Sequence, residues 1–365
     1  MPDDIEYMRE ALKLAESTRG RTSPDPMVGA VIVKDGEITA TGYHAEQGTP
    51  HAEAWALEKA GEKARGATLY LNLEPCSHFG YNPPCTKAII DAGIKKVVAA
   101  MQDPNPMVSG KGFAELREAG VEVEVGLLEK EARKLNEVFI KHITTGRPFV
   151  ILKAAMSLDG KIATKTGESF WITGMGARRY VHFLRSTVDA VMVGIGTVLK
   201  DDPELTVREI PKVYKNPFKI ILDGHGRTPR TAKVLKNEPS KTIIMVTKTA
   251  PAEKVKKLKE TGAEVLVFED LNGLVNLDAL MVELGKRKIT SLLIEGGGRV
   301  NAGAIKAGIV DKVIFFISPK LIGGEKAPTP VEGEGIEILS QAINLKDIRV
   351  ETIDGDILIE GYIVK

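Results

Sequence analysis

The feature that most constrains this chain is the position of its only two cysteines relative to one histidine. His51 is followed two positions later by Glu53, and Cys76 and Cys85 lie further along the chain. One imidazole and two thiolates form a good three-ligand set for zinc and leave the fourth position of the tetrahedron open for water. A fold that uses this set must bring three separate segments together.

Each ligand segment is expected at the edge of a regular element. His51 begins a predicted helix that follows Pro50, and Cys76 follows a predicted strand over residues 68–73. Cys85 precedes a predicted helix over residues 86–91. Helix N-termini carry partial positive charge, which favours the thiolate over the thiol at positions of this kind.

This order of residues predicts a chemistry. A His-x-Glu followed by Pro-Cys and a second Cys is the signature of zinc-dependent base deaminases. Zinc lowers the pKa of bound water from about 15.7 to about 7, which supplies a hydroxide for attack on an amino-bearing ring carbon. One carboxyl can take the proton of the water and pass it to the leaving ammonia. We assign that role to Glu53.

Other interpretations stay open. Two cysteines in a long chain are usually buried apolar residues. A structural zinc site would be closed by four protein ligands, and His78 could be the fourth. A deaminase that edits RNA would need a basic groove, which the net charge of +1 and the acids near His51 do not favour. A zinc module fused to a nucleotide-binding domain would be non-enzymatic.

Length and composition bound the class of protein. A chain of 365 residues predicts two or three domains, and 43% hydrophobic with 27% charged residues is typical of globular proteins. No apolar run is long enough to span a membrane, and the acidic start lacks the features of a signal peptide. We therefore expect a cytoplasmic protein with no membrane partner and, given its charge, no nucleic-acid partner.

The first half resembles the deaminase domain of the bifunctional riboflavin-biosynthesis deaminase/reductase family. The resemblance lies in Pro-Met-Val-Gly-Ala-Val at 26–31, Gly-Tyr-His at 42–44, Pro-His-Ala-Glu at 50–53, Leu-Glu-Pro-Cys-Ser-His at 73–78, Pro-Pro-Cys at 83–85 and Gln-Asp-Pro-Asn-Pro at 102–106. Eight residues separate the two cysteines, which is typical of this family, whereas most other zinc base deaminases have two there.

This resemblance implies a cytidine-deaminase-like three-layer domain that acts on 2,5-diamino-6-ribosylamino-4(3H)-pyrimidinone 5′-phosphate. Zinc would be held by His51, Cys76 and Cys85, with Glu53 as the catalytic residue.

The chain departs from the family pattern at four positions. Asp25 stands where the family has an asparagine that is thought to contact the pyrimidine, and Asn72 stands where a Thr or Ser is commoner. Tyr81 and Asn82 replace the family's Arg-Thr. The missing arginine removes a candidate partner for the substrate phosphate, but none of the four positions belongs to the zinc set.

The second half is predicted as a separate domain. A helical run over residues 129–141 leads to a Gly-Arg-Pro segment at 146–148, and Gly then Pro after a helix is a stop signal. We place the boundary between residues 1–145 and 146–365. Beyond it, apolar strands alternate with helices, which predicts an α/β fold with its own core.

A glycine triplet is the informative motif of this half. A predicted strand over residues 292–295 opens onto three glycines at 296–298, and a helix follows. This arrangement presents backbone N–H groups and a helix N-terminus to an anion. Such loops are also common plain turns, and the Rossmann fingerprint is absent.

The second half resembles the reductase domain of the same family, which is similar in fold to dihydrofolate reductase and uses NADPH. Matching segments lie at 157–163, 167–169, 171–173, 196–199, 201–203 and 295–297. By position, the resemblance puts the nicotinamide nucleotide on Ala155, Trp171, Thr197, Asp201 and the loop of Gly297, Gly298, Arg299, Val300, Asn301, Ala302 and Gly303. It puts substrate on Ser169, Arg185, Leu205, Arg208 and Glu295.

The implied reaction converts a ribosyl to a ribityl side chain. It needs a hydride from NADPH, and the protein mainly orients the nicotinamide against the reacting carbon. Arg185 and Arg208 can bind a phosphate bidentately, and Lys153 and Asp201 are both candidates for the proton donor. The resemblance further implies a small phosphoribosylaminopyrimidine substrate and a homo-oligomer, a dimer through the reductase half.

Overall fold

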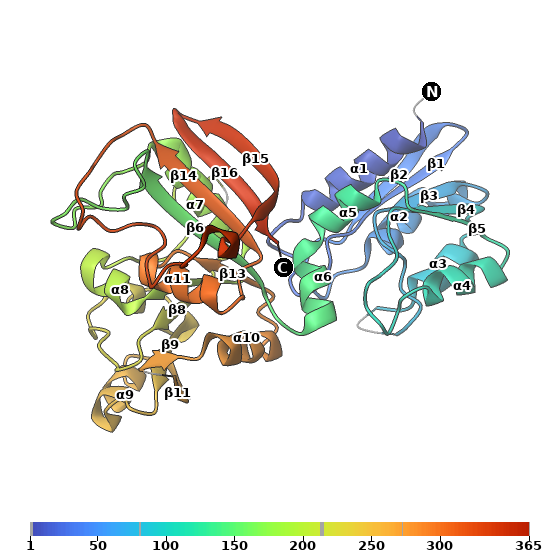
Figure 1. The fold of residues 1–365 in the computed structure, drawn as a ribbon. Coiled ribbons are helices and arrows are strands. Elements are labelled where there is room, and N and C mark those ends of the chain that lie inside the picture. The colour runs from blue at the N-terminus through green and yellow to red at the C-terminus, as the bar shows by residue number, and fades with distance from the viewer. Residues whose placement is uncertain (1–2, 80–81, 212–214, 272, 365) are drawn as a thin grey trace. The chain divides into compact units, whose positions relative to one another are not determined.

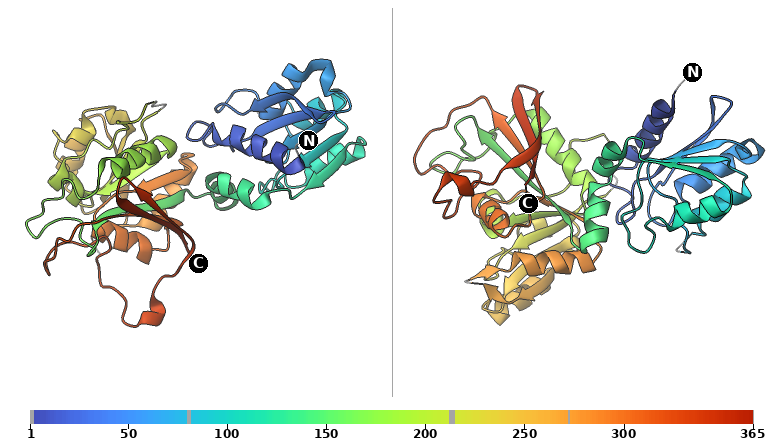
Figure 2. Two further views of the ribbon diagram at one scale, coloured as in Figure 1. Left: turned by 90° about the horizontal axis from the view of Figure 1, so that it is seen from above. Right: turned by 45° about the vertical axis from the view of Figure 1, so that its right-hand side comes forward.

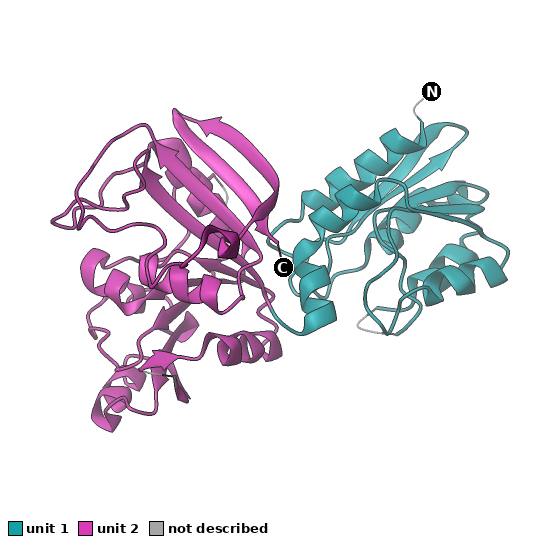
Figure 3. Cartoon of the chain, in the orientation of Figure 1, with its two compact units in different colours: residues 1–147 teal, residues 148–365 magenta. Residues whose placement is uncertain are grey.

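The computed structural model describes residues 3–79, 82–211, 215–271 and 273–364 (Figure 1). The chain divides into two compact units, residues 1–147 and residues 148–365 (Figure 3). The division therefore falls inside the Gly-Arg-Pro segment. None of the helices in the described residues has the length and apolar character needed to cross a bilayer.

Unit 1 is built on a five-stranded sheet in the order β2-β1-β3-β4-β5. Its strands are β1 (Gly29–Lys34), β2 (Glu37–Tyr43), β3 (Thr68–Leu71), β4 (Lys96–Ala99) and β5 (Glu122–Val125). β1 runs antiparallel to β2 and β3, and β3, β4 and β5 are parallel. The Asp-Gly pair at positions 35 and 36 predicts a hairpin turn. The structure has this turn between β1 and β2, and both residues have the positive φ that a tight hairpin turn requires.

Helices cover both faces of this sheet, which makes three layers (Figure 2). Packed on one face are α2 (Ala52–Ala60), the 3-10 helix η1 (Gly61–Ala64), α3 (Cys85–Asp91) and α4 (Lys111–Glu118), and on the other α1 (Asp4–Glu16) and α5 (Glu129–Leu135), followed by α6 (Glu137–Thr145). Side chains of a strand alternate between the two faces. Accordingly, Ala30 and Ile32 pack in the α2 and α3 core, whereas Val31 and Val33 pack in the α1 core.

Two sequence predictions for unit 1 are wrong in detail. The spacing of Ile5, Met8, Leu12 and Ala15 predicts one apolar helical face. Met8 and Ala15 are buried, but Ile5 is exposed, and Tyr7 and Ala11 are buried as well. The run over residues 129–141 is not one helix, because α5 ends before Asn136 and α6 begins after it. The buried Asn136 side chain binds both backbone groups of Met27, accepting from N at 2.9 Å and donating to O at 3.0 Å.

Unit 2 is built on a nine-stranded sheet in the order β10-β9-β8-β7-β13-β6-β14-β16-β15. The strands from β10 to β14 in this order are parallel, and β16 and β15 add an antiparallel edge. The strands are β6 (Phe149–Ser157), β7 (Ala190–Gly194), β8 (Phe218–Leu222), β9 (Thr242–Thr247), β10 (Glu264–Phe268), β13 (Ser291–Ile294), β14 (Lys312–Ser318), β15 (Leu345–Ile353) and β16 (Asp356–Ile363), with a separate pair β11 (Asp270–Leu271) and β12 (Leu274–Val275).

The helices of unit 2 are α7 (Met175–Thr187), α8 (Ile195–Asp201), α9 (Ala252–Lys259), α10 (Leu277–Lys286) and α11 (Gly298–Lys306). α10 and α11 contribute to a core with the central parallel strands. The sequence of residues 157–163 predicts a turn into a second extended stretch, and this prediction is wrong. Residues 158–163 form turns, because the Lys161 N–H binds Ser157 Oγ and the Leu158 N–H binds the Lys320 carbonyl.

Candidate active sites

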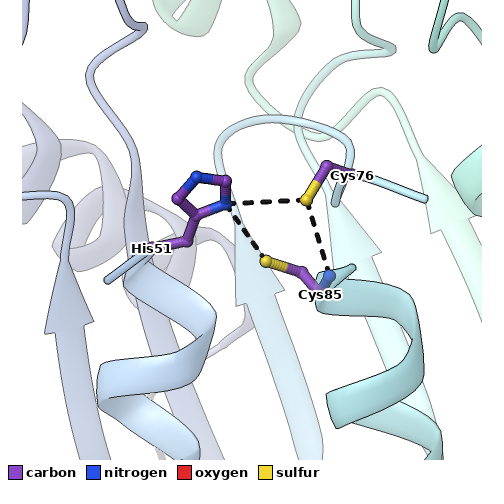
Figure 4. Close-up of side chains that lie close together, drawn as sticks. All are labelled: His51, Cys76 and Cys85. Atoms are coloured by element: carbon purple, nitrogen blue, oxygen red, sulfur yellow. Dashed lines mark hydrogen bonds between the residues drawn. The ribbon is translucent and has the colours of Figure 1, made fainter. Parts of the chain in front are cut away.

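Three side chains from distant parts of unit 1 point toward one another (Figure 4). His51 Nδ1 lies 3.3 Å from Cys85 Sγ and 3.5 Å from Cys76 Sγ. A tetrahedral zinc ion holds a nitrogen and a sulfur ligand about 3.6 Å apart, so the spacing and the donor set both fit zinc. Within the described part of the chain, no other group of three or more His, Cys, Asp or Glu side chains gathers in this way.

The local fold explains this convergence. His51 is the residue before the first turn of α2, and Cys85 is the first residue of α3. Cys76 lies in the loop after β3, where its Sγ accepts the Cys85 N–H at 3.5 Å and its carbonyl accepts the Thr86 N–H at 3.2 Å. His78, the candidate fourth ligand, is exposed and does not belong to the cluster.

The three ligand side chains differ in how readily they hold a proton. Hydrogen bonds from Cys85 and then His51 lower the pKa of Cys76 to about 4, against the opposing effect of burial. The same contacts raise the pKa of His51 to about 8 and raise the pKa of Cys85. These shifts favour the thiolate at Cys76 and the protonated forms of its two neighbours, whose protons a metal must displace.

Glu53 lies in the first turn of α2, with only 3% of its surface exposed. Burial raises the pKa of its carboxyl, and the nearby Cys76 raises it further. A buried carboxyl that readily exists in both protonation states is suited to accept and return a proton.

Three of the four positions that depart from the family pattern, Asp25, Asn72 and Asn82, have structural contacts. His44 packs edge-on against His51, with ring centroids 5.5 Å apart, and its Nε2 lies 3.4 Å from Asp25 Oδ2. Asn72 Oδ1 accepts the Gly29 N–H at 2.8 Å, which ties the end of β3 to β1. Asn82 Nδ2 donates to the Thr49 carbonyl at 3.0 Å. Tyr81, like Gly80 before it, lies outside the described residues.

Unit 2 contains a cavity of about 390 Å³. Its lining includes eight residues that the sequence assigned to the cofactor or the substrate, namely Ala155, Trp171, Thr197, Asp201, Arg185, Leu205, Arg208 and Glu295. Ser169 is not part of the lining, but its Oγ donates to Asp201 Oδ1 at 3.3 Å. Eight positions spread over 141 residues therefore meet at one place.

The glycine triplet adjoins this cavity through Gly297, whose N–H donates to Thr197 Oγ1 at 3.3 Å. A Cβ on Gly296 would lie 3.0 Å from Gly194 N, and one on Gly298 would lie 2.4 Å from the Thr329 carbonyl oxygen. A Cβ on Gly297 would meet only Thr197 Oγ1, at 3.8 Å. Two glycines therefore allow close packing, and the middle one leaves open space at the start of α11.

The remaining residues of the predicted cofactor loop, Gly298 to Gly303, form the first turns of α11 and do not line the cavity. Asn301 Nδ2 donates to the Pro330 carbonyl at 2.7 Å, while its buried Oδ1 has no partner in the described structure. The open backbone at Gly297 and this unused acceptor fit the binding of a nucleotide at this edge of the sheet.

An ion pair dominates the inner wall of the cavity. Arg185 Nε lies 2.6 Å from Glu295 Oε1 and Nη2 lies 2.9 Å from Oε2, with both side chains largely buried. Arg185 Nη1 also donates to the Thr206 carbonyl. Burial by itself would raise the pKa of Glu295, but the charge and hydrogen bonds of Arg185 outweigh it and the pKa is lowered.

Lys153 lies on β6 in the same wall, and burial lowers its pKa despite the opposing charge of Glu295. Sequence reasoning did not single out Arg178 or His182, which also line the cavity from α7. It also missed that Leu205 adopts a positive φ of 55°, which is uncommon for a residue of this shape and typical of functional loops.

Comparison with known proteins agrees with the division of the chain into two compact units. Residues 1–101 match the model of the cytidine and deoxycytidylate deaminase zinc-binding region, and residues 148–359 match that of the RibD C-terminal domain. The riboflavin biosynthesis protein RibD of Aquifex aeolicus (strain VF5) is 47% identical over 356 residues, which cover 98% of this chain and 97% of that protein. The RibD of Escherichia coli (strain K12) is 42% identical, with 97% and 98% covered.

Two solved structures resemble this chain over nearly its whole length. Acinetobacter baumannii RibD is 40% identical with a TM-score of 0.89, and 99% of each chain is covered. A Thermotoga maritima diaminohydroxyphosphoribosylaminopyrimidine deaminase/5-amino-6-(5-phosphoribosylamino)uracil reductase is 39% identical with a TM-score of 0.85, and 99% of this chain and 98% of that one are covered.

Fold, sites and comparisons define a two-domain enzyme that joins a zinc-binding deaminase domain to a reductase domain. The chain belongs to the RibD family of riboflavin biosynthesis, and it is a bifunctional deaminase and reductase with zinc and NADPH as cofactors. The predicted fold class, a cytidine-deaminase-like domain followed by a dihydrofolate-reductase-like domain, is confirmed.

Proposed function

We propose that residues 1–145 deaminate 2,5-diamino-6-ribosylamino-4(3H)-pyrimidinone 5′-phosphate and that residues 146–365 reduce its ribosyl side chain with NADPH. The final product is 5-amino-6-(5-phosphoribitylamino)uracil. The observation that carries this proposal is the convergence of His51, Cys76 and Cys85 beside the buried Glu53. The two activities for which the Thermotoga maritima relative is named support the choice of substrate.

In the first step, His51, Cys76 and Cys85 would hold zinc, which when bound supplies an activated water at neutral pH. Glu53 takes a proton from that water as the water oxygen attacks the amino-bearing ring carbon. The protonated Glu53 then gives the proton to the amino nitrogen, and the carbon–nitrogen bond breaks to release ammonia. The raised pKa of the Glu53 carboxyl supports both transfers.

In the second step, NADPH supplies a hydride to C1 of the ribosyl group. The bond from C1 to the ring oxygen breaks, and that oxygen needs a proton. We favour Lys153 over Asp201 as the donor, because burial lowers the pKa of Lys153, whereas Asp201 already accepts a hydrogen bond from Ser169. Arg185 would position Glu295 against the substrate. Direct phosphate binding by Arg185 stays a prediction and would require this pair to open.

A two-part assay of Glu53→Gln tests the proposal. The amide cannot carry the proton, so ammonia release should fall by at least about a thousandfold, in the range of a lost general acid–base group. Zinc content should stay at one per chain, and NADPH oxidation with the deaminated intermediate should match the wild type. A variant that deaminates at the wild-type rate would refute the assignment of Glu53.

We also propose a cytoplasmic homo-oligomer that associates through the reductase unit and binds no nucleic acid. β15 lies at the edge of the nine-stranded sheet and exposes Ile348 and Val350. Unpaired edges with apolar residues are association sites, and the net charge of +1 favours no polyanion. Light scattering should give a multiple of the 39.5 kDa chain mass, and Val350→Lys should lower it.

A further inference from the structure

The positively charged side chains that line the reductase cavity differ in whether a carboxylate partner already neutralises their charge. Five line it, namely Lys153, Arg178, Arg185, Arg208 and Lys233. Three of these have a carboxylate partner: Arg185 pairs with Glu295, Arg208 with Glu204 at 3.1 Å, and Lys233 with Asp202 at 4.0 Å. Across the described ranges, Lys153 and Arg178 have no ion pair within 4.0 Å. Burial lowers the pKa of Lys153, which leaves Arg178 as the permanently charged residue without an ion pair among them.

Arg178 lies in the first turn of α7, with its guanidinium carbon 4.2 Å from the ring centroid of Trp171. Its Nε is buried and has no hydrogen-bond partner in the described part of the chain. A guanidinium stacked on an aromatic face keeps its in-plane N–H donors available at its edge. A buried donor without an acceptor is unfavourable, so a bound acceptor at this edge would relieve that cost.

The backbone that carries Trp171 is tied down by Lys320. Lys320 Nζ donates to the carbonyls of Trp171 and Ile172, both at 2.8 Å. The N-terminus of α7 is not itself the anion site, because the Gly174 N–H already donates to Asp356 Oδ2 at 2.6 Å. The Arg178 side chain therefore stacks on a tryptophan whose backbone is held by hydrogen bonds, and it is the group that a ligand would contact.

We propose that Arg178 binds the phosphate monoester that enters this cavity, supplied either by the 5′-phosphate of the substrate or by the 2′-phosphate of NADPH. This inference rests on the proposed reductase function. Arginine matches a phosphate with two parallel N–H donors and keeps its charge at any working pH. Arg185 cannot take this role without leaving Glu295 unpaired in a buried site.

Ligand binding to the full-length protein, measured without catalytic turnover, tests the proposed role of Arg178. Isothermal titration calorimetry with ribose 5-phosphate, NADP⁺ and NAD⁺ would compare the wild type with Arg178→Ala and Arg178→Lys. Arg179→Ala is the matched control, because Arg179 is the next residue of α7, is exposed, contacts Met175 Sδ and does not line the cavity. Its three affinities should match those of the wild type.

We expect Arg178→Ala to weaken one phosphate monoester ligand at least tenfold and Arg178→Lys to recover part of the loss. Loss confined to ribose 5-phosphate identifies the substrate phosphate. Loss for NADP⁺ with NAD⁺ unchanged identifies the cofactor 2′-phosphate. Unchanged affinities would overturn the proposal, and so would equal losses for all three ligands, which indicate that Arg178 only supports Trp171. Failure of the proposed reductase function is seen separately, as a wild-type protein that does not oxidise NADPH with the deaminated intermediate.

Discussion

Protons compete with zinc at the metal centre of unit 1. The hydrogen bond to Cys76 is the largest cause that raises the pKa of His51 to about 8, and the bond to Cys76 also raises the pKa of Cys85. Zinc binds neutral imidazole and thiolate, so both protons must leave when the metal enters. The same hydrogen bonds that preorganise the three side chains therefore make zinc uptake dependent on pH.

Zinc affinity should consequently rise with pH. Below a pKa of about 8, His51 carries a proton that zinc must displace, so each displaced proton weakens binding about tenfold for each pH unit lost. Competition with a chromophoric chelator between pH 6 and pH 8 would measure this slope. His78→Ala should leave the slope unchanged, because His78 lies outside the cluster. An affinity independent of pH would contradict the proton assignment.

At the scale of elements, the buried Glu74 ties the loop of Cys76 to the start of α4. Its carboxylate accepts backbone N–H groups from Asp103 at 3.0 Å, and from Gly110 and Gly112 at 2.9 Å each. A carboxylate at a helix N-terminus is also favoured by the helix dipole. Glu74 lies two positions before the ligand Cys76. Its side chain thus replaces the water that these loop amides would otherwise need.

Glu74→Gln should therefore destabilise unit 1. The amide keeps the size of the side chain but offers one acceptor oxygen in place of two, so buried N–H groups lose their partner at a cost of about 2 kcal/mol. Urea unfolding, followed by circular dichroism, would report this loss. Glu62→Gln, at an exposed position on η1, is the control and should change stability by less than about 0.5 kcal/mol. Equal midpoints for both variants would refute the role of Glu74.

The same scale shows what a sequence can predict. The zinc set could be inferred because its members lie at element edges with a rare spacing. The strand predicted over residues 37–43, after the Asp-Gly turn, has the bounds of β2. The break between α5 and α6 at Asn136 could not be predicted, because it is caused by contact with Met27, which is 109 residues away in the chain. Arg178 was missed since a helix face that lines a cavity has the same periodicity as one that meets solvent. The β15 and β16 hairpin also went unpredicted, because β15 is mostly exposed.

At the scale of the molecule, each unit has its own core. The clusters around the unit 1 sheet lie within residues 7–140, and the main cluster of unit 2 lies within residues 150–363. The zinc ligands all belong to the first unit, and the residues that line the reductase cavity all belong to the second. Loss of the metal should therefore act on one unit and leave the other intact.

Zinc removal tests this separation. After treatment with a strong chelator, ammonia release should stop, while NADPH oxidation with 5-amino-6-(5-phosphoribosylamino)uracil should continue at its former rate. Free zinc at a thousandfold excess over Kd stabilises by about 4 kcal/mol, so calorimetry should show the unit 1 transition about 10 °C lower without it. One equivalent of zinc should restore both properties, and Cys85→Ser should mimic the chelator. If reduction also fell after zinc removal, the reductase unit would depend on the metal and the two activities would not be separable.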